Sequence, residues 1–255
     1  MKVGFIITAR LKSTRLPRKL LLKIQGESVI GHMIERLKIS PYLDEIIVAT
    51  SKNPEDDELG LIAAEKGVKC FRGHEKNVVQ RLYMAAKEYT LDYIINTTGD
   101  CPLVAYDYIR DVIDLYETTE ADLITTSDLP HGMFFYGIKP EALNKILATL
   151  PRDAETSGWG IYFFDSGGFM VEKVSFPDEL NRKDLRLTLD YPEDFEMLTR
   201  LYEGLGKKVW SKPTRDIIHF LDAHPDIPRI NSFCEERYLK RFEEEYHYNP
   251  KLLEK

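Results

Sequence analysis

The chain has 255 residues, of which 43% are hydrophobic and 30% charged, and its formal net charge is -7. This composition predicts one large globular domain with a sizeable core, and the acidity argues against nucleic acid as a partner. No apolar run approaches the roughly 20 residues that span a bilayer, and the N-terminal apolar run is too short for a signal peptide, so we expect a cytoplasmic protein without membrane insertion. The three cysteines lack the spacing of a disulfide framework or a zinc site.

The first half of the chain alternates short apolar runs with amphipathic segments. The apolar runs predict buried strands at 3–7, 46–49, 93–95 and 123–124, and the amphipathic segments predict helices at 28–38, 55–66, 77–89 and 106–116. A further helix end is predicted at Gly67, followed by a short strand. Strands that alternate with helices of this length favour βαβ units and a mainly parallel sheet.

The second half breaks this alternation after about residue 128. We expect an irregular or antiparallel excursion at 130–139, a helix at 142–150 and strands at 167–176 and 185–190, before a helix from Pro192. The charged tail, 235–255, predicts a surface helix packed on the domain, with a partner-binding arm as the alternative. The predicted organisation is therefore one domain over 1–230, with an acceptor-side or dimerisation excursion at about 128–180, and a helical tail over 231–255.

A basic loop, "TARLKSTRLPRKLL" at 8–21, follows the first predicted strand in this acidic chain. Ligands of open α/β sheets gather at the carboxyl ends of the strands. Arg10, Arg15 and Lys19 are suited to neutralise a polyphosphate there, with short hydrogen bonds from Ser13 and Thr14. The P-loop pattern G-x-x-x-x-G-K-[ST] is absent, and the alternative is a solvated basic loop.

Two aspartates follow other predicted strands. Asp100 lies in "INTTGDCPL", where Gly99 permits close backbone approach, and Asp190 lies in "LRLTLDYPEDF". Carboxylate oxygens at such positions suit Mg²⁺, although a turn carboxylate for Asp100 and a helix N-cap for Asp190 are the simpler alternatives. Glu193 and Asp194 are expected only to interact favourably with the helix dipole. Together with the basic loop, the aspartates predict phosphoryl or nucleotidyl transfer.

Four motifs, in order over residues 1 to 203, resemble those of the CMP-sugar synthetases, a family that includes the acylneuraminate and 3-deoxy-manno-octulosonate cytidylyltransferases. "ARLKSTRLPRKLL" resembles the signature A-R-x-x-S-x-R-L-P-x-K. "FRGHEKNVVQRLYMAAKEY" is similar to a segment of the SpsF-type spore coat polysaccharide branch, and "TTGDCPL" and "RLTLDYPED" match later motifs of that branch. The SpsF-type branch is therefore the closer resemblance.

This resemblance implies a three-layer, GT-A-like and Rossmann-related nucleotidyltransferase fold with a mixed, mainly parallel sheet. It further implies CTP as co-substrate, Mg²⁺ as cofactor and a homodimer. The implied catalytic residues are Arg10, Lys19, Asp100 and Asp190, with Asp100 and Asp190 as the metal ligands. The implied nucleotide-binding residues are Ala9, Arg10, Ser13, Arg15, Lys19, Arg72, Asn77 and Thr98. For Arg72, a surface turn residue before Gly73 is the alternative.

The sequence departs from the branch in "RDAETSGWGIYFF" at 152–164, where an expected histidine is missing and Glu155, Thr156 and Ser157 occupy the region. This is the acceptor side of the implied pocket. His131 is a candidate for the same pocket, although a loop histidine is more often structural or solvated. Trp159 and Tyr162 are better explained by core packing than by contact with a sugar.

The sequence thus predicts a cytidylyltransferase that transfers CMP from CTP to a sugar acid or related hydroxyl acceptor and releases pyrophosphate, in surface polysaccharide biosynthesis. One alternative is a GT-A-type glycosyltransferase, which would require a D-x-D metal motif that "TTGDCPL" lacks. Another is a non-catalytic nucleotide-binding protein of a polysaccharide assembly pathway. The two candidate metal ligands argue against the second alternative.

Overall fold

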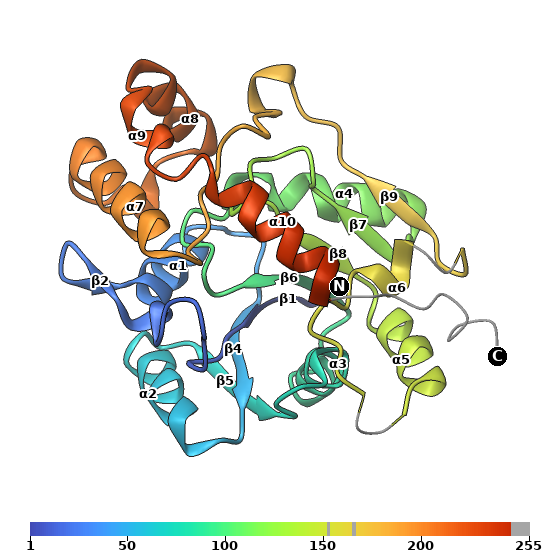
Figure 1. Ribbon diagram of the computed structural model, residues 1–255. Coiled ribbons are helices and arrows are strands. Elements are labelled where there is room, and N and C mark those ends of the chain that lie inside the picture. Colours follow the sequence, from blue (N-terminus) through green and yellow to red (C-terminus); the bar gives the residue numbers. More distant parts are fainter. Residues whose placement is uncertain (152–153, 165–166, 246–255) are drawn as a thin grey trace.

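The computed structural model describes residues 1–151, 154–164 and 167–245, and a seven-stranded sheet lies at its centre (Figure 1). The strand order is β5-β4-β1-β6-β8-β7-β9, in which β8 is antiparallel to both its neighbours and all other pairs are parallel. The strands are β1 (Val3–Thr8), β4 (Glu45–Ser51), β5 (Lys69–Gly73), β6 (Tyr93–Thr98), β7 (Leu123–Thr125), β8 (Tyr136–Ile138) and β9 (Val171–Lys173). The predicted mixed, mainly parallel sheet is confirmed.

Helices cover both faces of this sheet, which gives three layers (Figure 1). One core joins the sheet to α1 (Val29–Leu37), α2 (Asp57–Glu65), α4 (Ile109–Thr119), α7 (Pro192–Leu205) and α8 (Thr214–Ala223). The other core joins it to α3 (Val78–Glu88), α5 (Pro140–Thr149) and α6 (Ile161–Phe164). Alternate residues of β1 supply the two cores, because Phe5 and Ile7 face the first and Ile6 faces the second.

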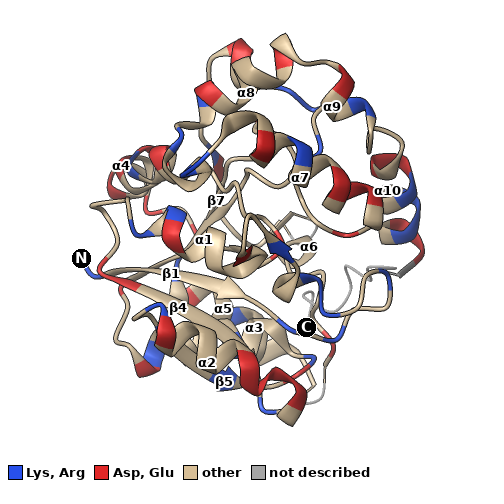
Figure 2. Cartoon of the chain, turned by 90° about the vertical axis from the view of Figure 1, so that its left-hand side faces the viewer, with Lys and Arg blue, Asp and Glu red and all other residues tan. Residues whose placement is uncertain are grey.

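Short elements connect these layers. The β2 (Lys23–Ile24) and β3 (Glu27–Ser28) strands form a separate hairpin, and α9 (Asp226–Arg229) and α10 (Cys234–Glu245) follow α8. The 3₁₀ turns are η1 (Lys19–Leu21), η2 (Pro54–Asp56), η3 (Tyr106–Tyr108), η4 (Asp178–Leu180) and η5 (Val209–Ser211). Figure 2 shows acidic and basic residues mixed along the outer helices rather than gathered into one basic face. No helix in the described ranges is long and apolar enough to cross a membrane.

Local capping explains where two of the predicted helices begin. The Ser28 hydroxyl accepts a hydrogen bond from the backbone N–H of Gly31 at 3.1 Å, and the Asn77 side chain accepts one from Gln80 at 2.9 Å. These bonds satisfy N–H groups that have no partner within the helix. Gly67 follows α2 with a φ of +68°, as its predicted role in ending that helix requires.

The predicted strand at 185–190 is wrong, although the predicted helix after it is present as α7. The backbone N–H of Leu187 donates to the carbonyl of His131 at 2.6 Å, and that of Leu189 donates to the carbonyl of Asp100 at 2.9 Å. Because β8 occupies the place beside β6, the extended segment 185–190 instead crosses the loops near the carboxyl end of β6.

The segment that crosses these loops carries a leucine at every second position from 185 to 189. Leu185, Leu187 and Leu189 are all buried, although the backbone of this segment is hydrogen-bonded to loops and not to a strand. Gly132 makes the crossing possible, since a Cβ on Gly132 would lie 2.3 Å from the carbonyl carbon of Leu187. Arg186, Thr188 and Asp190 between and after these leucines are buried as well, so the segment is enclosed on both sides although it is not a strand of the sheet.

Candidate active site

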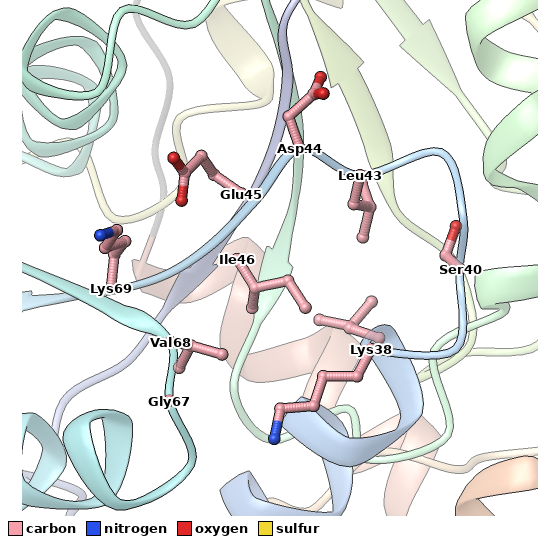
Figure 3. A pocket seen from close by; sticks show the side chains of 10 residues that line it. Lys38, Ser40, Leu43, Asp44, Glu45, Ile46, Gly67, Val68 and Lys69 are labelled. Carbon is pink, nitrogen blue, oxygen red and sulfur yellow. The ribbon is translucent and has the colours of Figure 1, made fainter.

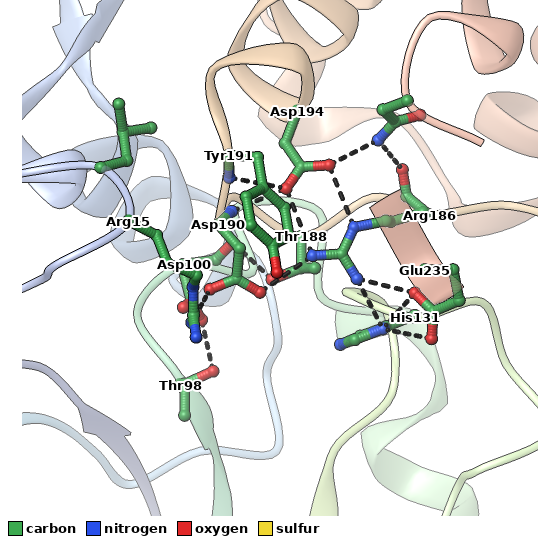
Figure 4. Close-up of polar contacts among 12 residues, drawn as sticks. Arg15, Thr98, Asp100, His131, Arg186, Thr188, Asp190, Tyr191, Asp194 and Glu235 are labelled. Atoms are coloured by element: carbon green, nitrogen blue, oxygen red, sulfur yellow. Dashed lines mark hydrogen bonds and ion pairs between the residues drawn. The ribbon is translucent and has the colours of Figure 1, made fainter. Parts of the chain in front are cut away.

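The turn after β6 and the segment 185–190 meet the basic loop around one lysine ammonium. Lys19 in η1 is hydrogen-bonded to the carboxylate of Asp100, and its Nζ lies 2.8 Å from Oδ1 of Asp190. Arg15 makes a second ion pair with the same Oδ1 (Figure 4). The structure therefore brings together four residues that the sequence had singled out separately: Arg15, Lys19, Asp100 and Asp190.

Gly99 allows the basic loop to approach the turn after β6 this closely. A Cβ on Gly99 would lie 3.3 Å from the Cβ of Ala9 and 3.3 Å from a methyl group of Leu20. Both contacts are tighter than ordinary van der Waals packing, so a larger residue would push the two loops apart. Ala9 is buried and its backbone N–H donates to the carbonyl of Ala49 at 3.1 Å, so it shapes the base of the loop.

Asp190 is almost fully buried and touches three cations. In addition to Lys19 and Arg15 on Oδ1, Nη2 of Arg186 lies 2.9 Å from Oδ2. Burial disfavours the charged form, but Lys19, Arg15 and Arg186 outweigh it and hold the pKa of Asp190 well below its usual range. Asp190 is therefore a carboxylate at neutral pH.

Lys19 is charged for the reciprocal reason. Burial alone would lower the pKa of its ammonium, yet the carboxylates of Asp100 and Asp190 raise that pKa above its ordinary value. Only 9% of the Lys19 side chain is exposed, so this ammonium is compensated by the aspartates rather than by water. The Lys19 ammonium thus occupies the space between the carboxylates of Asp100 and Asp190.

Asp194 has a structural role that the sequence analysis missed. Its carboxylate accepts hydrogen bonds from Nε of Arg186 at 3.0 Å and from the backbone N–H groups of Asp190 at 2.8 Å and Tyr191 at 3.0 Å. The N-cap of α7 is Tyr191, so the alternative that Asp190 caps this helix is wrong. Asp194 does more than interact with the helix dipole, because it fixes the backbone that carries Asp190.

Asp194→Ala is expected to lower the free energy of unfolding by about 3–5 kcal/mol, because it leaves Arg186 buried with a missing partner. Urea denaturation measures this loss. Glu193→Ala is the matched control on the same helical turn: the ion pair of Glu193 with Arg237 lies near the surface, and its loss is expected to cost about 0–1 kcal/mol. Equal losses for the two variants would contradict the assigned role of Asp194.

Three further candidates lie around the basic loop and the β6 turn. Nη1 of Arg10 donates to the backbone carbonyl of Glu75 at 3.0 Å, and the Ser13 hydroxyl accepts from the N–H of Leu16 at 3.4 Å. The Thr98 hydroxyl donates to Asp100. Thr98 therefore orients one of the two aspartates, whereas the hydrogen bonds described for Arg10 and Ser13 go to the backbone and not to either carboxylate.

Arg72 and Asn77 are engaged in bonds that hold neighbouring loops. Arg72 lies in β5 rather than in a turn, and it donates to the carbonyls of Ser51 at 3.0 Å and Asn53 at 2.8 Å. Asn77 is 1% exposed, and its Oδ1 accepts from the Thr156 hydroxyl at 3.1 Å as well as from the α3 backbone. The structure does not bring either residue into contact with the aspartates.

The acceptor-side candidates also have partners. Nδ1 of His131 lies 2.8 Å from Oε2 of Glu235 and 3.2 Å from Nη1 of Arg186. Trp159 and Tyr162 belong to the core shared with α3 and α5, which confirms the core-packing interpretation for both.

In the segment 152–164, the first two residues lie outside the described ranges. Glu155 forms a surface ion pair with Lys76, and Thr156 bonds to α3, while the Ser157 hydroxyl is buried.

Asp100 and Asp190 suit a Mg²⁺ ion that also binds a substrate. Both carboxylates lie within hydrogen-bonding distance of the same Lys19 atom, so a single cation can reach both. Among the residues described, no group of three His, Cys, Asp or Glu side chains could hold a metal ion by itself. Mg²⁺ characteristically takes one or two carboxylates and completes its shell with water and substrate phosphates, so the donor set fits.

A pocket of about 240 Å³ lies at the other end of the sheet (Figure 3). It is lined by the end of α1 and by the starts of β4 and β5, including Lys38, Asp44, Glu45 and Lys69. These are the amino ends of the strands, away from Asp100 and the carboxyl end of β6. The pocket is lined by none of the candidate catalytic, nucleotide-binding or metal-binding residues.

Comparison with known proteins places the chain among related sequences over nearly its whole length. It is 33% identical to the uncharacterized protein MJ1063 of Methanocaldococcus jannaschii over 245 residues, which cover 96% of this chain and 100% of that protein. It is 27% identical to the spore coat polysaccharide biosynthesis protein SpsF of Bacillus subtilis over 233 residues, which cover 87% and 95%. The predicted resemblance to the SpsF-type branch is confirmed.

The fold has a close counterpart among solved structures. A cytidylyltransferase from Leptospira borgpetersenii serovar Hardjo-bovis superposes with a TM-score of 0.80 at 31% identity, covering 89% of this chain and 97% of that protein. The sequence profile of the family described as Cytidylyltransferase matches residues 4–163, which include β1, the basic loop and Asp100. On this evidence the chain belongs to the cytidylyltransferase family.

Proposed function

We propose that this protein transfers CMP from CTP to a hydroxyl group of a sugar acid or a related acceptor and releases pyrophosphate. The observation that carries the proposal is the Lys19 ammonium held between the carboxylates of Asp100 and Asp190, with Arg15 beside it. Such a cluster supplies cations for a triphosphate and carboxylates for a metal ion in the same place. Family membership supports CTP as the nucleotide.

The proposed reaction forms one bond and breaks one. The acceptor hydroxyl oxygen attacks the α-phosphorus of CTP, and the bond between that phosphorus and the oxygen bridging to the β-phosphorus breaks. Pyrophosphate leaves with that oxygen, and the hydroxyl proton passes to solvent. The products are a CMP diester of the acceptor and pyrophosphate, so atoms and charges balance.

The residues of the chain act mainly by positioning and charge. Lys19 and Arg15 exchange Asp190 for the phosphate oxygens when the triphosphate binds, and they balance the charge of the departing pyrophosphate. Asp100 and Asp190, freed of those cations, would hold Mg²⁺. The metal would supply charge neutralisation at the phosphoryl oxygens under attack.

CTP is expected to bind more tightly than UTP, ATP or GTP. A site that hydrogen-bonds the amine of cytosine leaves buried polar groups unpaired when uracil takes its place. Isothermal titration calorimetry with the four triphosphates in the presence of Mg²⁺ measures the preference, and equal affinities for CTP and UTP would refute the base assignment.

Product analysis separates the proposed activity from its rivals. Pyrophosphate release is assayed with each triphosphate and a panel of sugar acids, neutral sugars and polyols. A glycosyltransferase would instead release a nucleoside diphosphate from a nucleotide sugar, and a non-catalytic protein would bind CTP without turnover. The similarity to SpsF supports a role in surface polysaccharide biosynthesis. The acceptor panel therefore includes sugars of the kind that surface polysaccharides contain.

A further inference from the structure

Arg186 connects the candidate active site to the C-terminal helix α10. The Arg186 side chain is 1% exposed, and its three nitrogens face three different carboxylates (Figure 4). Nη2 lies 2.9 Å from Asp190 and 3.2 Å from Asp194, Nε lies 3.0 Å from Asp194, and Nη1 lies 2.7 Å from Glu235, which is on α10. A guanidinium is a planar, rigid fork, so fixing two of its edges determines the direction of the third.

The chain segment around the start of α10 holds this guanidinium from several sides. The Asn231 amide donates to the backbone carbonyl of Arg186 at 3.0 Å and to Asp194 at 2.8 Å. The Arg186 guanidinium also lies 5.2 Å from the ring centroid of Tyr238 on α10. His131 touches both Glu235 and Arg186, so Glu235 itself is oriented.

This arrangement determines which oxygen of Asp190 faces the catalytic cations. Arg186 binds Oδ2, so Oδ1 is turned toward Lys19 and Arg15. A carboxylate without such a restraint rotates easily about its terminal torsion, which is broad. When Lys19 and Arg15 move to the phosphates, the hydrogen bond from Arg186 still holds the Asp190 carboxylate in its orientation.

We propose that Glu235 is a positioning residue for the nucleotidyl transfer, because it holds Arg186, which in turn keeps Oδ1 of Asp190 directed at the metal and nucleotide. The proposal rests on the proposed function. It makes α10 part of the active-site structure, although α10 lies outside residues 4–163, which the family profile matches. Tight positioning of ligands by their neighbours is a general requirement of metal sites.

The test replaces Glu235 by glutamine, which keeps the size and one acceptor oxygen but removes the charge that restrains Arg186. Mn²⁺ binding in the presence of CTP is followed by electron paramagnetic resonance, and pyrophosphate release is measured over a Mg²⁺ titration. Glu235→Gln is expected to weaken Mn²⁺ binding and raise the half-saturating Mg²⁺ concentration by about tenfold, with CTP binding in the absence of metal unchanged. Arg186→Lys, which keeps the charge but loses the fork, is expected to weaken Mn²⁺ binding by at least as much.

Glu236→Gln is the matched control, because Glu236 is the exposed neighbour on the same helix and the variant loses the same charge. Thermal melting checks that each variant is folded. If folded Glu235→Gln binds Mn²⁺ with CTP as tightly as the wild type and the Glu236→Gln control, α10 has only a structural role and the inference is wrong. If the wild type itself binds neither CTP nor Mn²⁺ with CTP, the proposed function fails as well, so the two failures are distinguished.

Discussion

Asp100→Asn is expected to lower turnover by about 100-fold or more while leaving the fold intact. Loss of a metal-ligand carboxylate forfeits several kcal/mol of charge stabilisation in the transition state, and each 1.36 kcal/mol is a factor of ten in rate. Asp100 is partly exposed, with 16% of its side chain accessible, so the amide is tolerated structurally. Pyrophosphate release at limiting and saturating Mg²⁺ measures the effect.

Asp190→Asn is expected to lose as much turnover and also to lower thermal stability. Asp190 compensates Arg15, Lys19 and Arg186, and its neutral amide leaves those cations close together and partly uncompensated. Asp184→Asn is the control, because that carboxylate is exposed and its ion pair is with Arg182, outside the candidate site. Near wild-type turnover of either site variant at limiting Mg²⁺ would show that the carboxylate is not a metal ligand.

Lys19→Ala is expected to weaken CTP binding by about ten- to a hundredfold and CMP binding much less. A hydrogen bond to a charged group contributes about 1.5–3 kcal/mol, and the distal cations of the loop should meet the β- and γ-phosphates, which CMP lacks. The structure adds a second expectation, because the Lys19 ammonium occupies the space between Asp100 and Asp190. Removing it should strengthen Mn²⁺ binding to the nucleotide-free protein, as measured by electron paramagnetic resonance.

Arg15→Ala is expected to show the same preference for loss of CTP over CMP. Lys12→Ala and Arg18→Ala are the matched controls, since both side chains are exposed and pair with Glu75 and Glu58 at the surface. Calorimetric titration of the four variants at two salt concentrations separates the interpretations. Similar, salt-screened losses at all four positions would mean that the loop is only a solvated basic surface.

The candidate site was predictable to the extent that its parts lie at strand ends. Parallel strands bring their carboxyl ends to one edge of the sheet, so the basic loop after β1 and Asp100 after β6 were expected at the same edge. That β1 and β6 are neighbours in the sheet was decided by the fold. The pattern also located Asp190 correctly before α7, although the reason given for it, a strand at 185–190, is wrong. Whether an extended segment joins the sheet depends on whether a strand edge is free to pair with it, and here β8 already pairs with β6.

Elements with local causes were predictable from the sequence alone: the buried strands of the first half, the helix starts capped by Ser28 and Asn77, and the clustering of cations in one loop. The bonds that Arg72 and Asn77 make, and the network of Arg186 with Asp194 and Glu235, depend on long-range folding and were not predictable. Glu235 is far from Arg186 in the sequence. The residues around Glu235 show only the apolar and charged periodicity of an ordinary amphipathic helix, which does not indicate a partner for its carboxylate. A buried charge is stabilised by whichever opposite charges lie close to it in space, and residues far apart in the sequence come close only when the chain folds.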